Sequence, residues 1–367
     1  MTPSPAIRIA SWPPWYTGNQ YLPLFYRALA ARGIEHVANV PFEWRALRQA
    51  GVSALHLHWP EPLWREGRQW PGARIGRLAR LGFRLRALER AGIPLLWTVH
   101  NLEPHEGGGP TDRAALRQLH RRAALRVFHS AWAEGIAQIR WPDARGPTLV
   151  MPHGNYDGVL PAPRPRDRVL AEAGVMSKAP VLLCVGQVRA YKGFDVAVAA
   201  SERLPTPSRL VIAGRPVGAA IDGLRHLAAG RSDVLLIPRD LSDQELADWF
   251  GAADVVLLPY HRSSGSGVLL HALTCGRSVV ASDLPPFREV AAPRPDAVAF
   301  VRAGDPDALA RGIGRMLARP AEERRRAARA LADCYPWETL VRPLSEWLQA
   351  ALGPAGDTRP PARPARA

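Results

Sequence analysis

Two polar segments in the second half of the chain combine glycines with groups that bind anions. The first follows the apolar run Val181–Val185 and carries Gly186, Arg189 and Lys192. Glycine allows a ligand to approach the backbone closely, and a pair of cations suits a phosphorylated ligand. Solvated loop charges are the competing interpretation. Because ligands of open α/β sheets bind at the carboxyl ends of strands, this segment predicts a phosphate site.

The second segment follows another apolar run, Val255–Leu258, which ends at Pro259. A loop rich in serine and glycine, Ser263–Gly267, then precedes an apolar stretch that predicts the start of a buried helix. Ser266 is placed to cap this helix, whose free N–H groups and dipole favour an anion. A flexible loop with an ordinary cap is the alternative. The cationic segment at a neighbouring strand end favours the anion site.

In the first half of the chain, histidines and carboxylates stand where two predicted strands end. His56, His58 and Glu61 close one strand, and His100 and Glu103 close the next. Side chains of these types at strand ends are suited to proton transfer. Two histidines two positions apart point the same way from a strand, which also fits a metal site, but no clear set of further ligands accompanies them, so no metal is predicted. Histidines hydrogen-bonded in the core are the third interpretation.

The elements that must position these residues alternate between strands and helices along the whole chain. Strands are expected at 7–10, 54–58, 94–99, 127–129, 148–151, 181–185, 209–213, 234–237, 255–258 and 278–282. Helices are expected at 22–32, 75–91, 310–331 and 336–352, with another beginning at 268. This order predicts an α/β fold of two Rossmann-like doubly wound domains that face a central cleft.

A proline-rich segment that begins at Leu160 suggests the hinge between the domains. The expected division is an N-terminal domain over 1–160, a C-terminal domain over 161–335, a C-terminal helix over 336–353 that packs back on the N-terminal domain, and a disordered tail over 354–367.

Composition is that of a globular protein. The 367 residues suffice to bury two cores, 47% of them are hydrophobic, and no apolar run is long enough to span a bilayer. The first residues lack the apolar region of a signal peptide, so a cytoplasmic protein is expected. The cysteines, Cys184, Cys275 and Cys334, have neither metal nor disulfide spacing and are expected to be core thiols.

The formal net charge of +15 fits nucleic acid, an anionic membrane or an anionic substrate. Arg77, Arg80 and Arg84 share one face of a predicted helix, which suits anionic lipid headgroups on the inner face of the plasma membrane. A solvated arginine-rich face is the alternative. No zinc-finger, RNA-binding or zipper pattern is present, so no nucleic-acid partner is expected.

Taken together, the chain from about residue 7 to 350 resembles the GT-B glycosyltransferases. More closely, it is similar to the xanthan-type GDP-mannose:glycolipid 4-β-D-mannosyltransferase family. The shared segments, which occur in the same order, are Trp12–Tyr21, Leu55–Glu61, Thr98–Glu106, Arg189–Gly193, and Leu257–Tyr260 followed by Ser266 and Gly267.

The resemblance implies an enzyme that moves a hexose from a GDP- or UDP-sugar to a lipid-linked oligosaccharide, without a cofactor or a required metal. It implies donor binding by Gly186, Arg189, Lys192, Tyr260, Ser264, Gly265, Ser266, Gly267 and His271. It implies acceptor binding by Trp15, Asn19, Tyr21, His58 and Asn101. For an inverting reaction the candidate bases are Glu61, His100 and Glu103.

Two departures leave alternatives open. Many retaining GT-B enzymes carry two glutamates eight positions apart in the donor loop, where this chain has Ser263 and His271. Gln20 replaces a proline of the family's N-terminal motif. A retaining transferase that uses another nucleotide sugar, and a sugar-nucleotide-binding protein without catalysis, are the alternative functions. The sequence does not indicate an oligomeric state.

Overall fold

The structure is a computed structural model that describes residues 7–14, 20–66, 70–104, 108–175 and 178–353. The chain divides into two compact units, the first formed by Met1–Pro152 with Trp337–Ala367 and the second by His153–Pro336. The division therefore falls at Pro152 and not at the expected residue 160. Backbone hydrogen bonds explain this, because Asn155 and Tyr156 donate to Tyr335 and Thr274 of the second unit.

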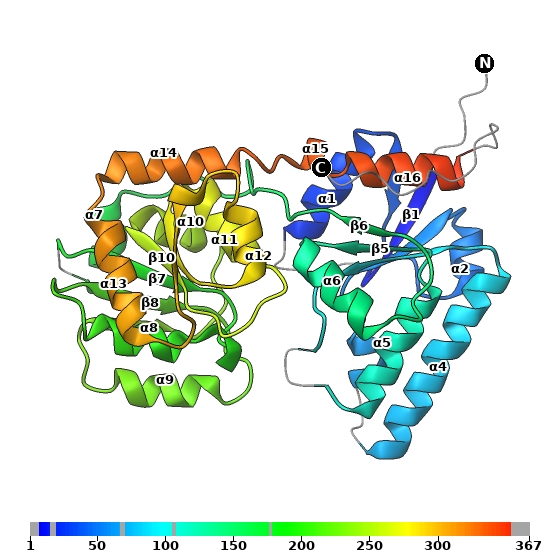
Figure 1. Cartoon of the computed structure of the whole chain (residues 1–367), viewed down its shortest axis with the longest axis horizontal. Coiled ribbons are helices and arrows are strands. Elements are labelled where there is room, and N and C mark those ends of the chain that lie inside the picture. The colour runs from blue at the N-terminus through cyan, green and yellow to red at the C-terminus, as the bar shows by residue number, and fades with distance from the viewer. Residues whose placement is uncertain (1–6, 15–19, 67–69, 105–107, 176–177, 354–367) are drawn as a thin grey trace. The chain divides into compact units, whose positions relative to one another are not determined.

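The first unit is built around a parallel six-stranded sheet (Figure 1). Its strands, in the order β2-β1-β3-β4-β5-β6, are β1 (Ile7–Trp12), β2 (Ile34–Val37), β3 (Ala54–Leu57), β4 (Leu95–Val99), β5 (Leu125–Phe128) and β6 (Thr148–Val150). Its helices are α1 (Tyr21–Ala30), α2 (Trp44–Gln49), α3 (Pro62–Arg65), α4 (Pro71–Arg90), α5 (Pro110–Arg122), α6 (Ala131–Arg140), α15 (Trp337–Leu340) and α16 (Arg342–Leu352). Helices cover both faces, so β3, β4 and β5 are buried throughout and their sequences read as nearly continuous apolar runs.

The C-terminal segment belongs to this first unit. Trp337 is buried, and its ring meets the edges of the Tyr21 and Phe25 rings from α1. The Arg32 guanidinium donates to Ser345 Oγ, and the Gln349 amide donates to the Arg32 carbonyl. The last helix therefore covers the same face of the sheet as α1. The tail expected over 354–367 lies outside the described residues.

The second unit also holds a parallel six-stranded sheet, in the order β12-β11-β10-β7-β8-β9. Its strands are β7 (Val181–Val185), β8 (Arg209–Ala213), β9 (Val234–Ile237), β10 (Val255–Leu258), β11 (Ser278–Ser282) and β12 (Val298–Val301). Its α-helices are α7 (Arg166–Glu172), α8 (Phe194–Ser201), α9 (Ala220–Ala228), α10 (Asp243–Ala252), α11 (Gly267–Thr274), α12 (Pro285–Ala291), α13 (Pro306–Leu317) and α14 (Ala321–Ala332). Helices α8 and α9 lie on one face, and α10, α11 and α14 on the other (Figure 1).

The order of the strands creates a switch point in the second sheet. From β7 the chain moves outward to β8 and β9, and it then crosses back to place β10 against the opposite side of β7. The connections that follow β7 and β10 therefore leave the sheet in opposite directions. Open α/β sheets bind ligands in the crevice that this divergence leaves at the carboxyl ends of the strands.

The expected α/β class with two doubly wound parallel sheets is confirmed. One expected helix, 310–331, is wrong: it is two helices, α13 and α14, because Pro320 stands directly before α14 and has no N–H with which to continue α13. The helix expected from residue 75 begins earlier, at Pro71, where proline is favoured in the first turn.

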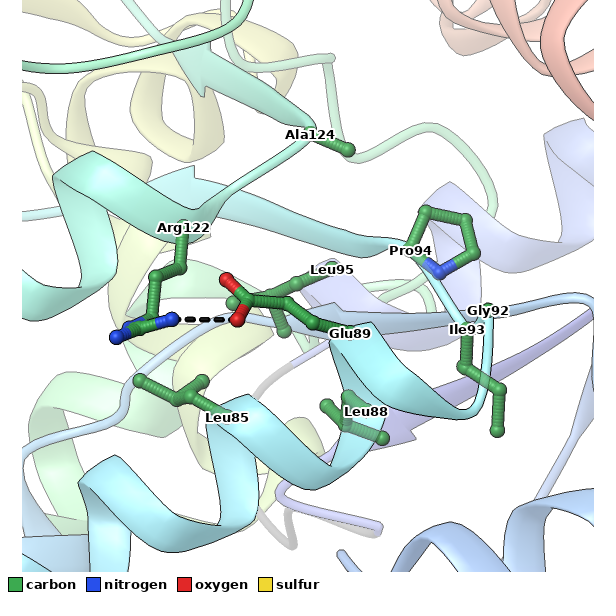
Figure 2. A pocket seen from close by; sticks show the side chains of 9 residues that line it. All are labelled: Leu85, Leu88, Glu89, Gly92, Ile93, Pro94, Leu95, Arg122 and Ala124. Carbon is green, nitrogen blue, oxygen red and sulfur yellow. Dashed lines mark hydrogen bonds and ion pairs between the residues drawn. The ribbon is translucent and has the colours of Figure 1, made fainter.

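A cavity of about 330 Å³ opens beside the end of α4 in the first unit. Figure 2 shows Leu85, Leu88 and Leu95 along it, and the ion pair between Arg122 and Glu89 across it. Leu95 begins its strand, so this cavity lies at the amino ends of the strands. The polar residues singled out in the sequence lie at the opposite, carboxyl ends.

Candidate functional site

In the second unit, the two glycine-containing loops meet at the switch point. The loop after β7 and the loop after β10 are joined by a backbone hydrogen bond of 2.8 Å from the His261 N–H to the Tyr191 carbonyl. Gly193 has a φ of +60°, and a Cβ added there would lie 2.1 Å from the Pro259 carbonyl oxygen. Only glycine permits this approach. The two segments predicted from the sequence therefore lie in one site.

Lys192 is the central charge of this site. It ends the short 3-10 helix Ala190–Lys192, and only 7% of its surface is exposed. Its ammonium lies over the Tyr260 and Phe194 rings, 5.4 and 5.9 Å from their centres. Among the residues that the structure describes, none forms a hydrogen bond or ion pair with it. Burial, aided by the nearby Arg189, lowers the pKa of Lys192 to about 8.

A buried ammonium without an anionic partner is unusual, because charged groups are almost always paired when they leave water. Gly186 makes this placement possible. It has a φ of +108°, and a Cβ there would lie 2.7 Å from the Lys192 nitrogen. Arg189 is half-buried beside it and donates through Nε to Gln187 at 3.0 Å. This arrangement concentrates positive charge at the end of β7.

The side chain of Ser263 forms hydrogen bonds within the loop before α11. Ser263 Oγ accepts from the Gly265 N–H at 3.1 Å and donates to the Gly265 carbonyl at 2.7 Å. Ser264 is half-buried in the same loop. Ser266 is the N-cap residue, as expected, but its side chain makes no capping hydrogen bond. The proposed anion site at this helix end therefore consists of backbone N–H groups and not of a serine cap.

Gly267 and His271 lie on α11, where the helix meets an aromatic cluster. A Cβ at Gly267 would lie 2.5 Å from the Tyr156 hydroxyl. The His271 ring stacks on Tyr156 at 4.2 Å between centres and contacts Phe250. Burial lowers the pKa of His271 to about 4, so its ring is neutral at physiological pH. His271 thus packs in the last turn of α11 against Tyr156 and Phe250.

In the first unit, four histidines are joined in one hydrogen-bonded group. His56 from β3, His58 directly after β3, His100 after β4 and His129 after β5 lie next to one another at the carboxyl ends of the strands. His100 is half-buried and stacks on Trp59, with ring centres 4.3 Å apart, while the other three are buried. Burial lowers the pKa of His56 to about 3 and that of His129 to about 4.

The two candidate carboxylates have different surroundings. Glu61 stands directly before α3, half-buried, and burial raises the pKa of its carboxyl even though Arg65 and a hydrogen bond with Asn101 act in the opposite direction. Glu103 instead forms an ion pair with Arg140 and is more than one third exposed. The raised pKa of Glu61 is the change that favours a general base.

The expected acceptor residues fall into three groups. Tyr21 and His58 are each 1% exposed and lie against His100, behind the surface of the site. Asn101 is half-buried and contacts Glu61. Trp15 and Asn19 lie outside the described residues.

The three arginines of the expected membrane patch do not share one open face. Arg77 donates to the Trp64 carbonyl at 3.1 Å, and Arg84 lies over the Phe42 ring, so both lie half-buried against their own unit. Arg80 is exposed. The exposed face of α4 carries Ile75 and Phe83, which are 64% and 65% exposed.

Within the described ranges, no group of three or more His, Cys, Asp or Glu is placed to hold a metal ion. The same part of the chain contains no helix that is long and apolar enough to cross a membrane. Sequence reasoning missed His129 and Tyr26. His129 had a usable signal, because it follows β5 as His100 follows β4. Tyr26 lies on α1, among other aromatic residues, and had none.

Known proteins resemble both the sequence and the fold. Residues 179–319 match the family described as Glycosyl transferases group 1. The chain is 32% identical over 274 residues to a D-inositol 3-phosphate glycosyltransferase of Xylanimonas cellulosilytica, which covers 69% of this chain and 65% of that protein. It is 29% identical over 275 residues to the GDP-mannose:glycolipid 4-beta-D-mannosyltransferase of Xanthomonas campestris pv. campestris. This alignment covers 72% of this chain and 69% of that protein. The chain thus spans about two thirds of the length of these relatives.

Among solved structures, a sucrose-phosphate synthase from Thermosynechococcus elongatus superposes with a TM-score of 0.70 at 19% identity, covering 93% of this chain and 98% of that one. Anabaena HepE in complex with UDP superposes with a TM-score of 0.66 at 16% identity, and the superposition covers 94% of this chain and 99% of that one. The chain therefore carries a glycosyltransferase group 1 domain and has the fold of the GT-B glycosyltransferases.

Proposed function

We propose that the protein transfers a hexose from a nucleotide diphosphate sugar to a polyprenyl-diphosphate-linked oligosaccharide in bacterial exopolysaccharide synthesis. The observation that carries this proposal is the ammonium of the buried Lys192, which has no anionic partner among the described residues, at the switch point of a group 1 domain. Mannose from GDP-mannose is the first donor to test, because one of the relatives is named for that reaction.

The donor diphosphate supplies the anion that Lys192 lacks. Arg189 and the backbone N–H groups before α11 add to the positive potential. As the glycosidic bond breaks, negative charge grows on the departing nucleoside diphosphate, so these contacts strengthen in the transition state. Neither a cofactor nor a metal is needed for this stabilisation. The solved structure of HepE with UDP supports a nucleotide ligand for this fold.

On the acceptor side, an inverting reaction requires a base that removes the proton of the attacking hydroxyl. Glu61 is our candidate, because partial burial raises the pKa of its carboxyl, whereas Glu103 forms an ion pair with Arg140. Asn101 orients it. A retaining reaction would not use a base at this place, and analysis of the product anomer by NMR separates the two mechanisms.

A second acceptor class follows from the relatives named D-inositol 3-phosphate glycosyltransferase, which match this chain as well as the mannosyltransferases do. A phosphorylated cyclitol is therefore the alternative acceptor, with another nucleotide sugar as the alternative donor. A protein that binds sugar nucleotides without catalysis would keep the Lys192 site and show no transfer to either acceptor.

The lipid-linked acceptor places the reaction at a membrane. The exposed face of α4 supports peripheral attachment, since Ile75 and Phe83 stand among Arg80, Arg86 and Arg90. Apolar side chains that insert beside cations are the arrangement by which helices lie on anionic bilayers. The inner leaflet of the plasma membrane is the location that we propose for the protein.

The test combines radiolabelled donors with both acceptor classes. Purified protein is incubated with GDP-mannose, UDP-glucose and other nucleotide sugars, with either a lipid-linked oligosaccharide extract or D-inositol 3-phosphate. Label in the lipid fraction with one donor supports the proposal. Label only in the cyclitol fraction selects the alternative, and donor binding without any transfer indicates a non-catalytic protein.

A further inference from the structure

A continuous line of hydrogen bonds crosses the first unit beneath its half-buried His100. It begins at the Met151 carbonyl, which lies 2.9 Å from His129 Nδ1. A carbonyl oxygen can only accept, so His129 carries its proton on Nδ1. Burial keeps this ring neutral at physiological pH, which leaves Nε2 as an acceptor.

With a neutral His100, the direction of each following bond is then determined. His129 Nε2 lies 3.3 Å from His100 Nδ1, which must therefore be the donor. With its proton on Nδ1, a neutral His100 has a lone pair on Nε2. That nitrogen lies 3.2 Å from His58 Nδ1, which donates to it in turn. The tautomer of each ring is thus set by the hydrogen bond that the preceding ring makes.

The same order continues into the core. His58 Nε2 lies 2.9 Å from the Tyr26 hydroxyl and accepts its proton. The Tyr26 oxygen accepts from His56 Nδ1 at 3.1 Å, and His56 Nε2 accepts from the Thr98 hydroxyl at 2.8 Å. Every ring nitrogen of the four histidines has one partner of the opposite kind, with all four rings neutral.

We infer that the Met151 carbonyl and His129 hold all four histidines in the Nδ1–H tautomer, and that His129 is a positioning residue for His100. The reversed order would turn the lone pair of His129 Nδ1 toward a carbonyl oxygen, so that two acceptors would face each other. A proton added to His100 Nε2 would face the N–H of His58, unless the protons of His58, Tyr26 and His56 all reversed with it. The first change leaves buried polar groups unsatisfied, which makes it costly.

One consequence for catalysis rests on the proposed function. Both ring nitrogens of His100 are engaged, its face stacks on Trp59, and the edge of the Tyr21 ring meets it at 5.0 Å between centres. The ring is therefore fixed in position and has no lone pair to offer an acceptor hydroxyl. This leaves Glu61 as the base of the first unit, and His100 as a ring held in a fixed position.

The tautomers are measured directly by nitrogen NMR, without any substrate. In protein labelled with ¹⁵N-histidine at pH 7.5, long-range proton–nitrogen correlations distinguish the Nδ1–H, Nε2–H and doubly protonated rings. Signals are assigned from single variants that lose one histidine. We expect His56, His58, His100 and His129 all to show the Nδ1–H pattern. An Nε2–H or doubly protonated ring at any of these four positions overturns the inference.

Two variants test the role of His129. In His129→Gln the amide can still donate to Met151 and accept from His100, whereas His129→Phe can do neither. His100 and His58 should keep the Nδ1–H pattern in the first variant and become tautomer mixtures in the second. In the transfer assay, His129→Phe should lower kcat at least about tenfold with little change in donor KM, since a wrong tautomer misplaces a catalytic-site ring. His129→Gln should restore most of this loss.

These readouts separate the two proposals. If the four histidines show the expected tautomers but the protein transfers no sugar, the inference about the hydrogen bonds is supported and the proposed function is contradicted. If His129→Phe does not fold, the wild-type spectrum alone decides. Unchanged tautomers in a folded His129→Phe protein would contradict the positioning role.

Discussion

Gly193 lies directly against the carbonyl of Pro259, so that any side chain at 193 would begin 2.1 Å from that oxygen. Through this contact, the loop after β7 and the loop after β10 are held together at the switch point of the second sheet. Lys192, the neighbouring residue, is buried.

Gly193→Ala should destabilise the protein by about 3 kcal/mol or more, because it adds a clash with backbone to a left-handed conformation. Gly218→Ala is the matched control. Gly218 has a φ of +68°, but no atom lies within 4 Å of its added Cβ, so that change should cost only about 1–2 kcal/mol. Chemical denaturation measures both values, and equal losses in the two variants would refute the close approach.

Glu61→Gln should lower kcat about 10²- to 10⁴-fold while donor binding stays unchanged, because it removes a base and keeps the shape of the side chain. Glu103→Gln serves as the control. It breaks an ion pair with Arg140 on a partly exposed surface and should cost far less than the lower end of that range. Initial rates with the identified donor test the pair, and a Glu61→Gln enzyme with nearly normal kcat would end the inverting-base assignment.

The double variant Ile75→Ser, Phe83→Ser should weaken binding to anionic vesicles by about tenfold or more, because two exposed apolar side chains no longer insert. Ile139→Ser, on α6, removes an apolar side chain that is 79% exposed and should leave vesicle binding unchanged. Sedimentation with vesicles of phosphatidylglycerol and phosphatidylcholine measures the effect. Equal binding by all three proteins would show that α4 is not the membrane face.

Stability should fall as the pH drops below the pKa of a free histidine. Burial lowers the pKa of His120 to about 3 in the folded unit, so the unfolded chain binds more protons between pH 6.5 and 3 and is favoured there. At pH 5, this residue alone accounts for a loss of up to about 2 kcal/mol relative to pH 7.5. His120→Phe keeps an aromatic ring against Trp97 and Trp141, and should show a correspondingly smaller loss in denaturation at the two pH values.

Much of this architecture is predictable from the sequence. Apolar runs such as Val181–Val185 identify buried parallel strands, and polar residues directly after them mark the carboxyl ends where sites form. The segments around Lys192 and Gly267 are predictable as ligand-binding loops by this rule. Their adjacency follows from the strand order, which the sequence suggests only through the general rules for doubly wound sheets.

Other features depend on packing that no local pattern encodes. The sequence shows that Arg77, Arg80 and Arg84 share a helical face, but not that this face turns partly toward Trp64 and Phe42. The direction of the hydrogen bonds among the four histidines depends on how side chains at three strand ends and on one helix are oriented relative to one another. Its origin, a backbone carbonyl at Met151, carries no sequence information.

The most direct test of the account is nucleotide-sugar binding to Lys192→Met. Methionine fills nearly the same space without a buried charge, so the variant should be at least as stable as the natural protein. A lost charge-assisted contact to the diphosphate is worth about 1.5–3 kcal/mol, so calorimetry should show the identified donor binding about 10- to 100-fold more weakly. In the natural protein, affinity should also fall as the pH rises above about 8, where free Lys192 loses its proton, and this dependence should vanish in the variant. A stable Lys192→Met protein that binds the donor with unchanged affinity would contradict the phosphate role of Lys192 and the function built on it.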